Sequence, residues 1–160
     1  MEYLNLYDDK GNLLNEIGIR GKENNNNNLE GIAIIFIQNS RGEFLIQKTS
    51  RSRGHEFSTT GGHVLFGSDF LDTIIREVNE ELGIDIAKEK IIEANTYVVE
   101  HYFQKVYYVR KDINIKDIKV QKSEVDYVSW LSKEEINKLI KNNEFRKGNI
   151  EGYKYIINNF

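Results

Sequence analysis

The strongest constraint on the fold is a segment in which nearly every side chain is apolar, GIAIIFIQ at residues 31–38. A short apolar run bounded by turn residues is typical of a strand that is buried on both faces. A second strand-like segment, FLIQKTS at 44–50, follows the turn NSRGE. The two segments predict neighbouring strands at the centre of a sheet.

One helix is predicted a few residues after the glycine pair at 61–62. Its apolar residues recur at helical spacing and form a single stripe, made of Leu71, Ile74, Ile75, Val78 and Leu82. Asp69 is a suitable N-cap, and Gly83 is a suitable C-terminal stop. We therefore expect a helix from about Phe70 to Leu82.

The rest of the chain adds more strands than helices. The pattern at the N-terminus predicts a β-hairpin, followed by a mobile asparagine-rich surface loop, which together occupy 1–29. Residues 91–112 predict two or three strands and 125–131 another. Ser132 and Glu135 form a capping box ahead of a second helix, and 152–159 predict a short third one.

Because strands outnumber helices and do not alternate with them regularly, we predict an α+β fold. It consists of a mixed sheet packed between helices, an α/β/α sandwich, with the N-terminal hairpin as an extension. With 160 residues, the chain has the usual size of one domain, so we expect a single domain over 1–160.

Composition narrows the function classes. The formal net charge of −3 gives no basic excess, which argues against nucleic acid or a membrane surface as partner and favours a small-molecule ligand. The chain has no cysteine, so disulfides, thiolate metal sites and cysteine nucleophiles are excluded. No apolar stretch approaches the length of a membrane span, and the first residues lack a signal-peptide pattern. We expect a cytoplasmic protein.

The predicted helix at 70–82 carries three glutamates, Glu77, Glu80 and Glu81, which share one sector of its surface. Crowded carboxylates raise one another's pKa unless a cation lies among them. Hard carboxylate oxygens suit Mg²⁺ or Mn²⁺, and the lack of cysteine and clustered histidine argues against zinc. The alternative is a solvated helix face paired with lysines.

The segment from Gly62 to Ile84 resembles the Nudix box, G-x5-E-x7-R-E-U-x-E-E-x-G-U, where U is a bulky aliphatic residue. Every fixed position matches except Ser68, which stands in place of a glutamate. The flanking segments also resemble a Nudix domain, and the N-terminal hairpin resembles that of the branch near isopentenyl diphosphate isomerases. The resemblance implies a Nudix-type fold and metal-dependent hydrolysis of a pyrophosphate bond in a nucleoside diphosphate linked to another group, or in a nucleoside di- or triphosphate.

The resemblance also implies roles for individual residues. Glu77 is the candidate general base or water-orienting carboxylate and a possible metal ligand, and Arg76 would hold it in place. Glu80 and Glu81 would bind the metal, Mg²⁺ or Mn²⁺, together with the carbonyl of Gly62. Glu124, just before the last predicted strand, is a further candidate ligand, and an ordinary loop carboxylate is the alternative.

Substrate contacts are expected from the segment before the box and from its start. Lys48, Arg51 and Arg53 cluster where the phosphates should lie, although surface segments are often charged. His63 follows the glycine pair and is a candidate substrate contact, and a solvent-facing histidine is the alternative. The N-terminal hairpin would allow a homodimer by extending the sheet.

Two other functions stay open at this point. The serine at position 68 cannot ionise there, which keeps open a protein that binds a nucleotide without cleaving it. An isopentenyl diphosphate isomerase is disfavoured, because that family relies on a cysteine near Thr59, Thr60 and Gly61, and this chain has none.

Overall fold

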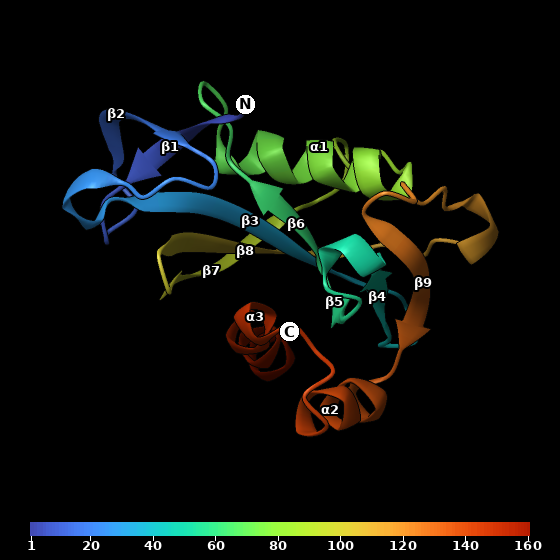
Figure 1. Cartoon of the computed structure of the whole chain (residues 1–160). Helices are drawn as coiled ribbons and strands as arrows, with labels where there is room; N and C mark the ends of the chain where they lie inside the picture. The colour runs from blue at the N-terminus through green and yellow to red at the C-terminus, as the bar shows by residue number, and fades with distance from the viewer.

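The computed structural model describes all 160 residues, which form a nine-stranded mixed sheet with helices on both faces (Figure 1). The strands are β1 (Tyr3–Tyr7), β2 (Leu13–Ile19), β3 (Leu29–Gln38), β4 (Phe44–Thr49), β5 (Phe57–Ser58), β6 (Thr60–His63), β7 (Ile92–Val99), β8 (Tyr102–Arg110) and β9 (Val125–Leu131). The helices are α1 (Phe70–Leu82), α2 (Lys133–Lys141) and α3 (Lys147–Asn159). Three single 3₁₀ turns join them: η1 (Asn25–Asn27), η2 (Arg51–Arg53) and η3 (Ile115–Asp117).

Strand β3 is the centre of the sheet. Along one edge it pairs in parallel with β8, from Glu30 opposite Tyr102 to Gln38 opposite Arg110. It also pairs antiparallel with β1, β6 and β4 at successive positions. Strand β4 pairs with β5 and β9, and β7 pairs with β8. The predicted mixed sheet is therefore confirmed.

Side chains of β3 alternate between two hydrophobic cores, as expected for a strand buried on both faces. Ile35 and its odd-numbered neighbours pack under α1, with Ile74, Val78 and Leu82. Ile34 and Phe36 pack on the opposite face, in a core that contains Tyr153 of α3 and Ile136 of α2. Figure 1 shows α1 on one face of the sheet and α2 and α3 on the other. The predicted layered α+β arrangement is thus confirmed.

Helix α1 has the predicted bounds, and both predicted caps are present. The Asp69 side chain accepts a hydrogen bond of 2.8 Å from the backbone N–H of Asp72, and Gly83 adopts the left-handed conformation at the other end. One member of the predicted stripe is wrong, because Leu71 is 44% exposed. Phe70 is buried at the start of the helix instead, with its ring centroid 4.9 Å from that of Tyr7.

Helix α2 begins with the predicted capping box at Ser132 and Glu135. Helix α3 begins at Lys147, five residues before the predicted start. The first turns contain glycine and asparagine, which are weak helix formers, so the sequence pattern did not indicate them. The helix is stabilised by packing against the sheet instead. Gly152 lies so close to β8 that an added Cβ would be 3.0 Å from Val106.

The predicted N-terminal hairpin is present as β1 and β2. Its turn is stabilised by the Asp8 carboxylate, which accepts hydrogen bonds from the backbone N–H groups of Lys10 and Asn12. The asparagine-rich loop contains the single turn η1, and Asn28 donates a hydrogen bond of 2.7 Å to Glu16. Strand β2 lies at the sheet edge, so a homodimer through it stays a prediction.

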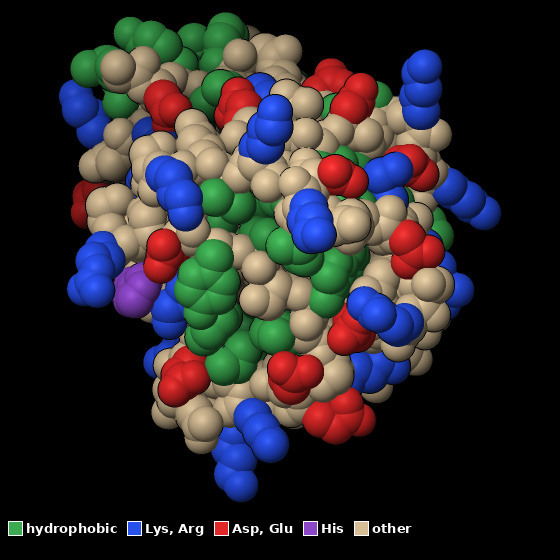
Figure 2. Space-filling view, turned by 90° about the vertical axis from the view of Figure 1, so that its right-hand side faces the viewer, with side chains coloured by type: hydrophobic (Ala, Val, Ile, Leu, Met, Phe, Trp, Pro, Cys, Tyr) green, Lys and Arg blue, Asp and Glu red, His purple; other side chains and the backbone are tan.

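The helices and the charged side chains bear on two classes of partner, membranes and nucleic acids. None of the three helices combines the length and the apolar character that a bilayer crossing requires. Figure 2 shows the side of the molecule that carries β9, where acidic and basic side chains are interspersed with hydrophobic ones between them. That face offers no broad basic surface for a nucleic-acid backbone.

The two apolar residues of α1 with opposite environments provide a test of the fold. Ile74 is 0% exposed, so Ile74→Ala should lower the free energy of unfolding by about 2–5 kcal/mol. Leu71→Ala, the matched control in the same helix, should change it by about 0.5 kcal/mol or less. Urea unfolding of both variants measures this, and equal losses would contradict the placement of α1.

Candidate active site

The acidic side chains of α1 occupy three different environments. Glu81 is buried, Glu77 is largely buried, and the Glu80 side chain is 49% exposed. Arg76 lies between two of them, with one guanidinium nitrogen 2.9 Å from Glu77 Oε1 and another 3.0 Å from Glu80 Oε2. The arginine therefore compensates part of the negative charge of both glutamates, and it is hydrogen-bonded to Glu80.

Gly62 of β6 lies directly against the Glu77 carboxylate. A Cβ added at Gly62 would stand 2.3 Å from Glu77 Cδ and Oε1, a distance that no side chain can occupy. Gly62 is held in the sheet by its pairing with Ala33 of β3. Glycine is therefore required here so that the strand backbone and the carboxylate of α1 can meet.

Burial makes negative charge costly at Glu77 and Glu81. Burial raises the pKa of Glu77 to about 7, although Arg76 acts in the opposite direction. Burial, followed by the charge of Glu77, raises the pKa of Glu81 to about 8. The Glu81 carboxylate has one weak hydrogen bond, 3.4 Å from Gln47 Nε2. A cation between the two carboxylates would remove this cost.

A fourth carboxylate, Glu124, reaches the same region from the segment before β9. That segment is fixed to the end of α1, because the backbone N–H of Gln121 donates to the Glu81 carbonyl at 2.9 Å. Glu124 pairs with Arg53 at 2.6 Å, and its charge contributes to the raised pKa of both Glu77 and Glu81. The fold thus brings Glu124 beside the acidic helix.

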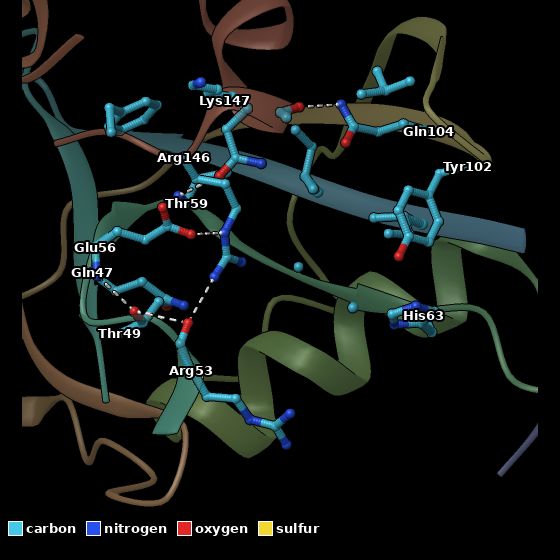
Figure 3. A pocket seen from close by; sticks show the side chains of 18 of the residues that line it. Gln47, Thr49, Arg53, Glu56, Thr59, His63, Tyr102, Gln104, Arg146 and Lys147 are labelled. Atoms are coloured by element: carbon cyan, nitrogen blue, oxygen red, sulfur yellow. Dashed lines mark hydrogen bonds and ion pairs between the residues drawn. The ribbon is translucent and has the colours of Figure 1, made fainter. Parts of the chain in front are cut away.

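A cavity of about 700 Å³ opens beside these carboxylates (Figure 3). It lies among β3, β6, β8, the η2 turn and the first turn of α3, and Glu81, Glu124 and Gly62 form part of its wall. Figure 3 shows Arg146 extending toward Glu56 and Arg53. The Nε of Arg146 lies 2.7 Å from Glu56 Oε1, and its Nη2 donates a hydrogen bond of 3.4 Å to the Arg53 carbonyl.

The predicted substrate-binding residues separate into two groups. Arg53 and His63 line the cavity. Lys48 and Arg51 are not among its lining residues, and Lys48 Nζ lies 4.3 Å from the centroid of the Phe57 ring. Burial and the charge of Arg20 lower the pKa of His63 to about 4, so this imidazole is neutral at pH 7 and offers hydrogen bonds without positive charge.

Several lining residues were not indicated by the sequence: Arg20, Gln47, Glu56, Gln104, Arg146, Lys147 and Asn149. They come from the end of the hairpin, β4, the segment before β5, β8 and the start of α3, so only the tertiary fold brings them together. The one local signal was the basic pair Arg146 and Lys147 before Gly148, adjacent to a helix whose start had been placed too late.

Ser68, where the sequence departs from the box pattern, lies just before α1. Its hydroxyl donates to the Asp69 carbonyl at 3.4 Å and lies 3.5 Å from Thr73 Oγ1. Asp69 is occupied as the N-cap, as expected. Neither side chain pairs with Arg76, whose carboxylate partners are Glu77 and Glu80.

The donor set at this site fits a hard divalent cation. It consists of carboxylate oxygens and the backbone of Gly62, which are the ligand types that Mg²⁺ and Mn²⁺ prefer. No three acidic or histidine side chains converge into a metal cluster in this structure. Glu80 is turned toward Arg76 and is half exposed, so its side chain is not held beside the other two carboxylates.

Comparison with known proteins agrees with this geometry. The sequence model of the NUDIX domain family matches residues 28–152. A Nudix hydrolase of Listeria monocytogenes is 29% identical over 149 residues, which cover 91% of this chain and 88% of the relative. The mouse asymmetrical bis(5'-nucleosyl)-tetraphosphatase is 29% identical over 125 residues, covering 75% of this chain and 84% of that protein.

Solved structures share the fold. A Deinococcus radiodurans crystal structure superposes with a TM-score of 0.78 at 21% identity and covers 93% of this chain and 94% of its own. A Caenorhabditis elegans Ap4A hydrolase complex superposes with a TM-score of 0.57 at 19% identity, covering 81% and 99%. Since the family model covers most of the sequence, and the fold agrees with it, the chain belongs to the Nudix family.

Proposed function

We propose that the protein hydrolyses the pyrophosphate bond of a nucleoside diphosphate linked to another group, or of a nucleoside di- or triphosphate. The observation that carries this proposal is the pair of buried carboxylates, Glu77 and Glu81, beside a cavity whose lining combines acidic side chains with basic ones. Membership of the Nudix family supports the hydrolase class.

A divalent cation, Mg²⁺ or Mn²⁺, would be held by Glu77, Glu80, Glu81 and the Gly62 carbonyl, with Glu124 as a further ligand. When bound, such an ion neutralises phosphate oxygens and acidifies water. The protein contributes a fixed position for these oxygens, because the segment 121–124 is hydrogen-bonded to the end of α1 and Gly62 of β6 packs against Glu77 of α1.

Glu77 is the candidate to orient the attacking water and take its proton. The carboxylate forms an ion pair with Arg76 at 2.9 Å, and contact with Gly62 limits its movement toward β6. A carboxylate in this position can accept a proton from the attacking water, as a general base does. No covalent intermediate on the protein is needed.

The substrate phosphates would lie near Arg53, Arg146 and Lys147. The two arginines are each held by a carboxylate, Glu124 or Glu56, which keeps their guanidinium groups at the cavity wall. A guanidinium can bind two phosphate oxygens at once. The mouse relative is named as acting on bis(5'-nucleosyl) tetraphosphates, so dinucleoside polyphosphates belong among the first substrates to test.

The alternative is a protein that binds a nucleotide without cleaving it, and Ser68 is the observation that favours it. Release of phosphate or pyrophosphate from a panel of nucleotides, nucleotide sugars and dinucleoside polyphosphates, with Mg²⁺, distinguishes the two. Turnover of at least one compound supports the hydrolase, whereas tight binding without turnover supports the alternative.

Glu77→Gln should reduce turnover by at least about 100-fold, because glutamine keeps the size of the side chain but cannot accept the proton. The variant should fold, since it removes a buried group whose charge is unfavourable. Asp72→Asn changes an exposed carboxylate of the same helix and is the control. Full activity of Glu77→Gln in a steady-state assay would remove this residue from the role.

The buried carboxylates also predict how stability depends on pH without metal. The pKa values of Glu77 and Glu81 are raised to about 7 and 8 from 4.5, so the folded state keeps protons that the unfolded state has released. Stability should therefore fall by about 2–3 kcal/mol between pH 6.5 and pH 8.5 in EDTA. His63, with its pKa lowered to about 4, contributes its own dependence only below pH 6.5.

Glu81→Gln should remove the larger part of that loss, because Glu81 has the higher pKa. Added Mg²⁺ should flatten the dependence in the unmodified protein and have less effect in the variant. Denaturant unfolding at the two pH values measures both effects. An unmodified protein equally stable at both, in EDTA, would show that these carboxylates are not raised in pKa.

A further inference from the structure

Two side-chain amides line the cavity although both residues are almost completely buried. Asn149, in the first turn of α3, and Gln104 of β8 are each 4% exposed. They are neighbours, because Gln104 donates a hydrogen bond of 3.0 Å to the carbonyl of Gly148, the residue before Asn149. Figure 3 shows Gln104 on the wall where the α3 end meets the strand.

The backbone fixes which end of each amide faces the cavity. The N–H of Thr59 donates at 3.1 Å to Asn149 Oδ1, so the other end of Asn149 is the NH₂ group. The Gly148 carbonyl can accept only from the Gln104 NH₂ group, so the other end of Gln104 is the oxygen Oε1. The reversed orientation would place two donors or two acceptors against each other.

Neither free end has a partner within the protein. Asn149 Nδ2 donates to no protein group, and Gln104 Oε1 accepts from none. Both free ends are also accessible from the cavity. Only two side-chain polar atoms are fully buried without a hydrogen-bond partner, Ser58 Oγ and one nitrogen of Arg76, and neither belongs to these amides. The wall therefore presents one oriented donor, from Asn149, and one oriented acceptor, from Gln104.

We propose that Asn149 and Gln104 recognise the hydrogen-bonding edge of a nucleobase in the substrate. This inference rests on the proposed function and adds the residues that select the substrate. A nucleobase edge offers a donor and an acceptor side by side in one plane, which two amides can match. A phosphate group offers acceptors only, and the oxygen of Gln104 would repel it.

The surroundings of the amides suit a flat ring. Ile32 lies beside Gln104 on the neighbouring strand, in register, and lines the same cavity. Phe145 and Tyr102 also contribute to the wall. An apolar isoprenoid chain would leave both amides without hydrogen-bond partners, which is unfavourable for buried polar groups. The amide pair therefore disfavours an isopentenyl substrate.

Isothermal titration with ADP, GDP, CDP, UDP, ribose 5-diphosphate and inorganic pyrophosphate, each with Mg²⁺, tests the inference. The unmodified protein should bind at least one nucleoside diphosphate about tenfold or more tightly than ribose 5-diphosphate and should distinguish among the bases. Equal binding of ribose 5-diphosphate would assign the amides to sugar hydroxyls and overturn the inference. Equal binding of pyrophosphate would overturn it as well.

Asn149→Asp keeps the oxygen that accepts from Thr59 and replaces only the donor that faces the cavity. Its preference for the best nucleoside diphosphate over pyrophosphate should fall by about tenfold or more. Asn142→Asp makes the same change at an exposed position at the end of α2, outside the cavity, and should keep the preference. A preference that survives in Asn149→Asp would overturn the inference.

Gln104→Met provides a second variant, with similar size and no polar end, should Asn149→Asp fail to fold. It should lose the same preference, and retention of the preference would again overturn the inference. The outcomes separate from those of the proposed function. If the protein hydrolyses a substrate but binds all bases equally, and the variants bind as the unmodified protein does, the amide assignment alone is refuted. If the protein prefers one base but hydrolyses no substrate, hydrolysis alone is refuted.

Discussion

The contact between α1 and β6 is the constraint on which the site depends. Two carboxylates, Glu77 and Glu81, are taken out of water at this contact, although each is more stable there without its charge. The contact is possible because β6 has a glycine, Gly62, where a Cβ would overlap Glu77. Apolar packing of Ile74, Val78 and Leu82 on the sheet supplies the free energy that keeps the acids buried. The hydrophobic face of α1 thus stabilises an arrangement that its polar face opposes.

The charges around the site are balanced in pairs, and this has a consequence for metal binding. Arg76 holds Glu77 and Glu80, and Arg53 holds Glu124. A divalent ion that recruits Glu80 and Glu124 would have to compete with both arginines. Arg53, which lines the cavity, would then be free to interact with the phosphates of the substrate, which arrive with the negative charge that Glu124 had provided. Metal and substrate would therefore support each other's binding through exchange of ion-pair partners.

The features that local chemistry determines were predictable from the sequence, and those that depend on tertiary contact were not. The Asp69 and Ser132 caps and the burial of β3 follow from residue type and spacing within a few positions, and the structure confirms them. The exposure of Leu71 does not follow from the local pattern, because Phe70 occupies the space beside Tyr7 of the distant hairpin. The start of α3 was missed for a related reason, since packing against β8 overrides weak helix formers. The cavity wall includes residues from β4, β8 and α3 that no local pattern connects.

The cavity is built from both faces of the sheet, and this separates two tasks. Glu81 reaches it from α1, which covers one face, and Asn149 reaches it from α3, which covers the other. Their anchors are different, because Glu81 depends on the α1 core while Asn149 is held by the Thr59 backbone. The strands between them, β3 and β6, are joined by direct pairing and fix the distance between the two walls. A substrate that spans the cavity would place its phosphates between Glu81 and the start of α3, where Arg146 and Lys147 lie, and its distinguishing group beside Asn149.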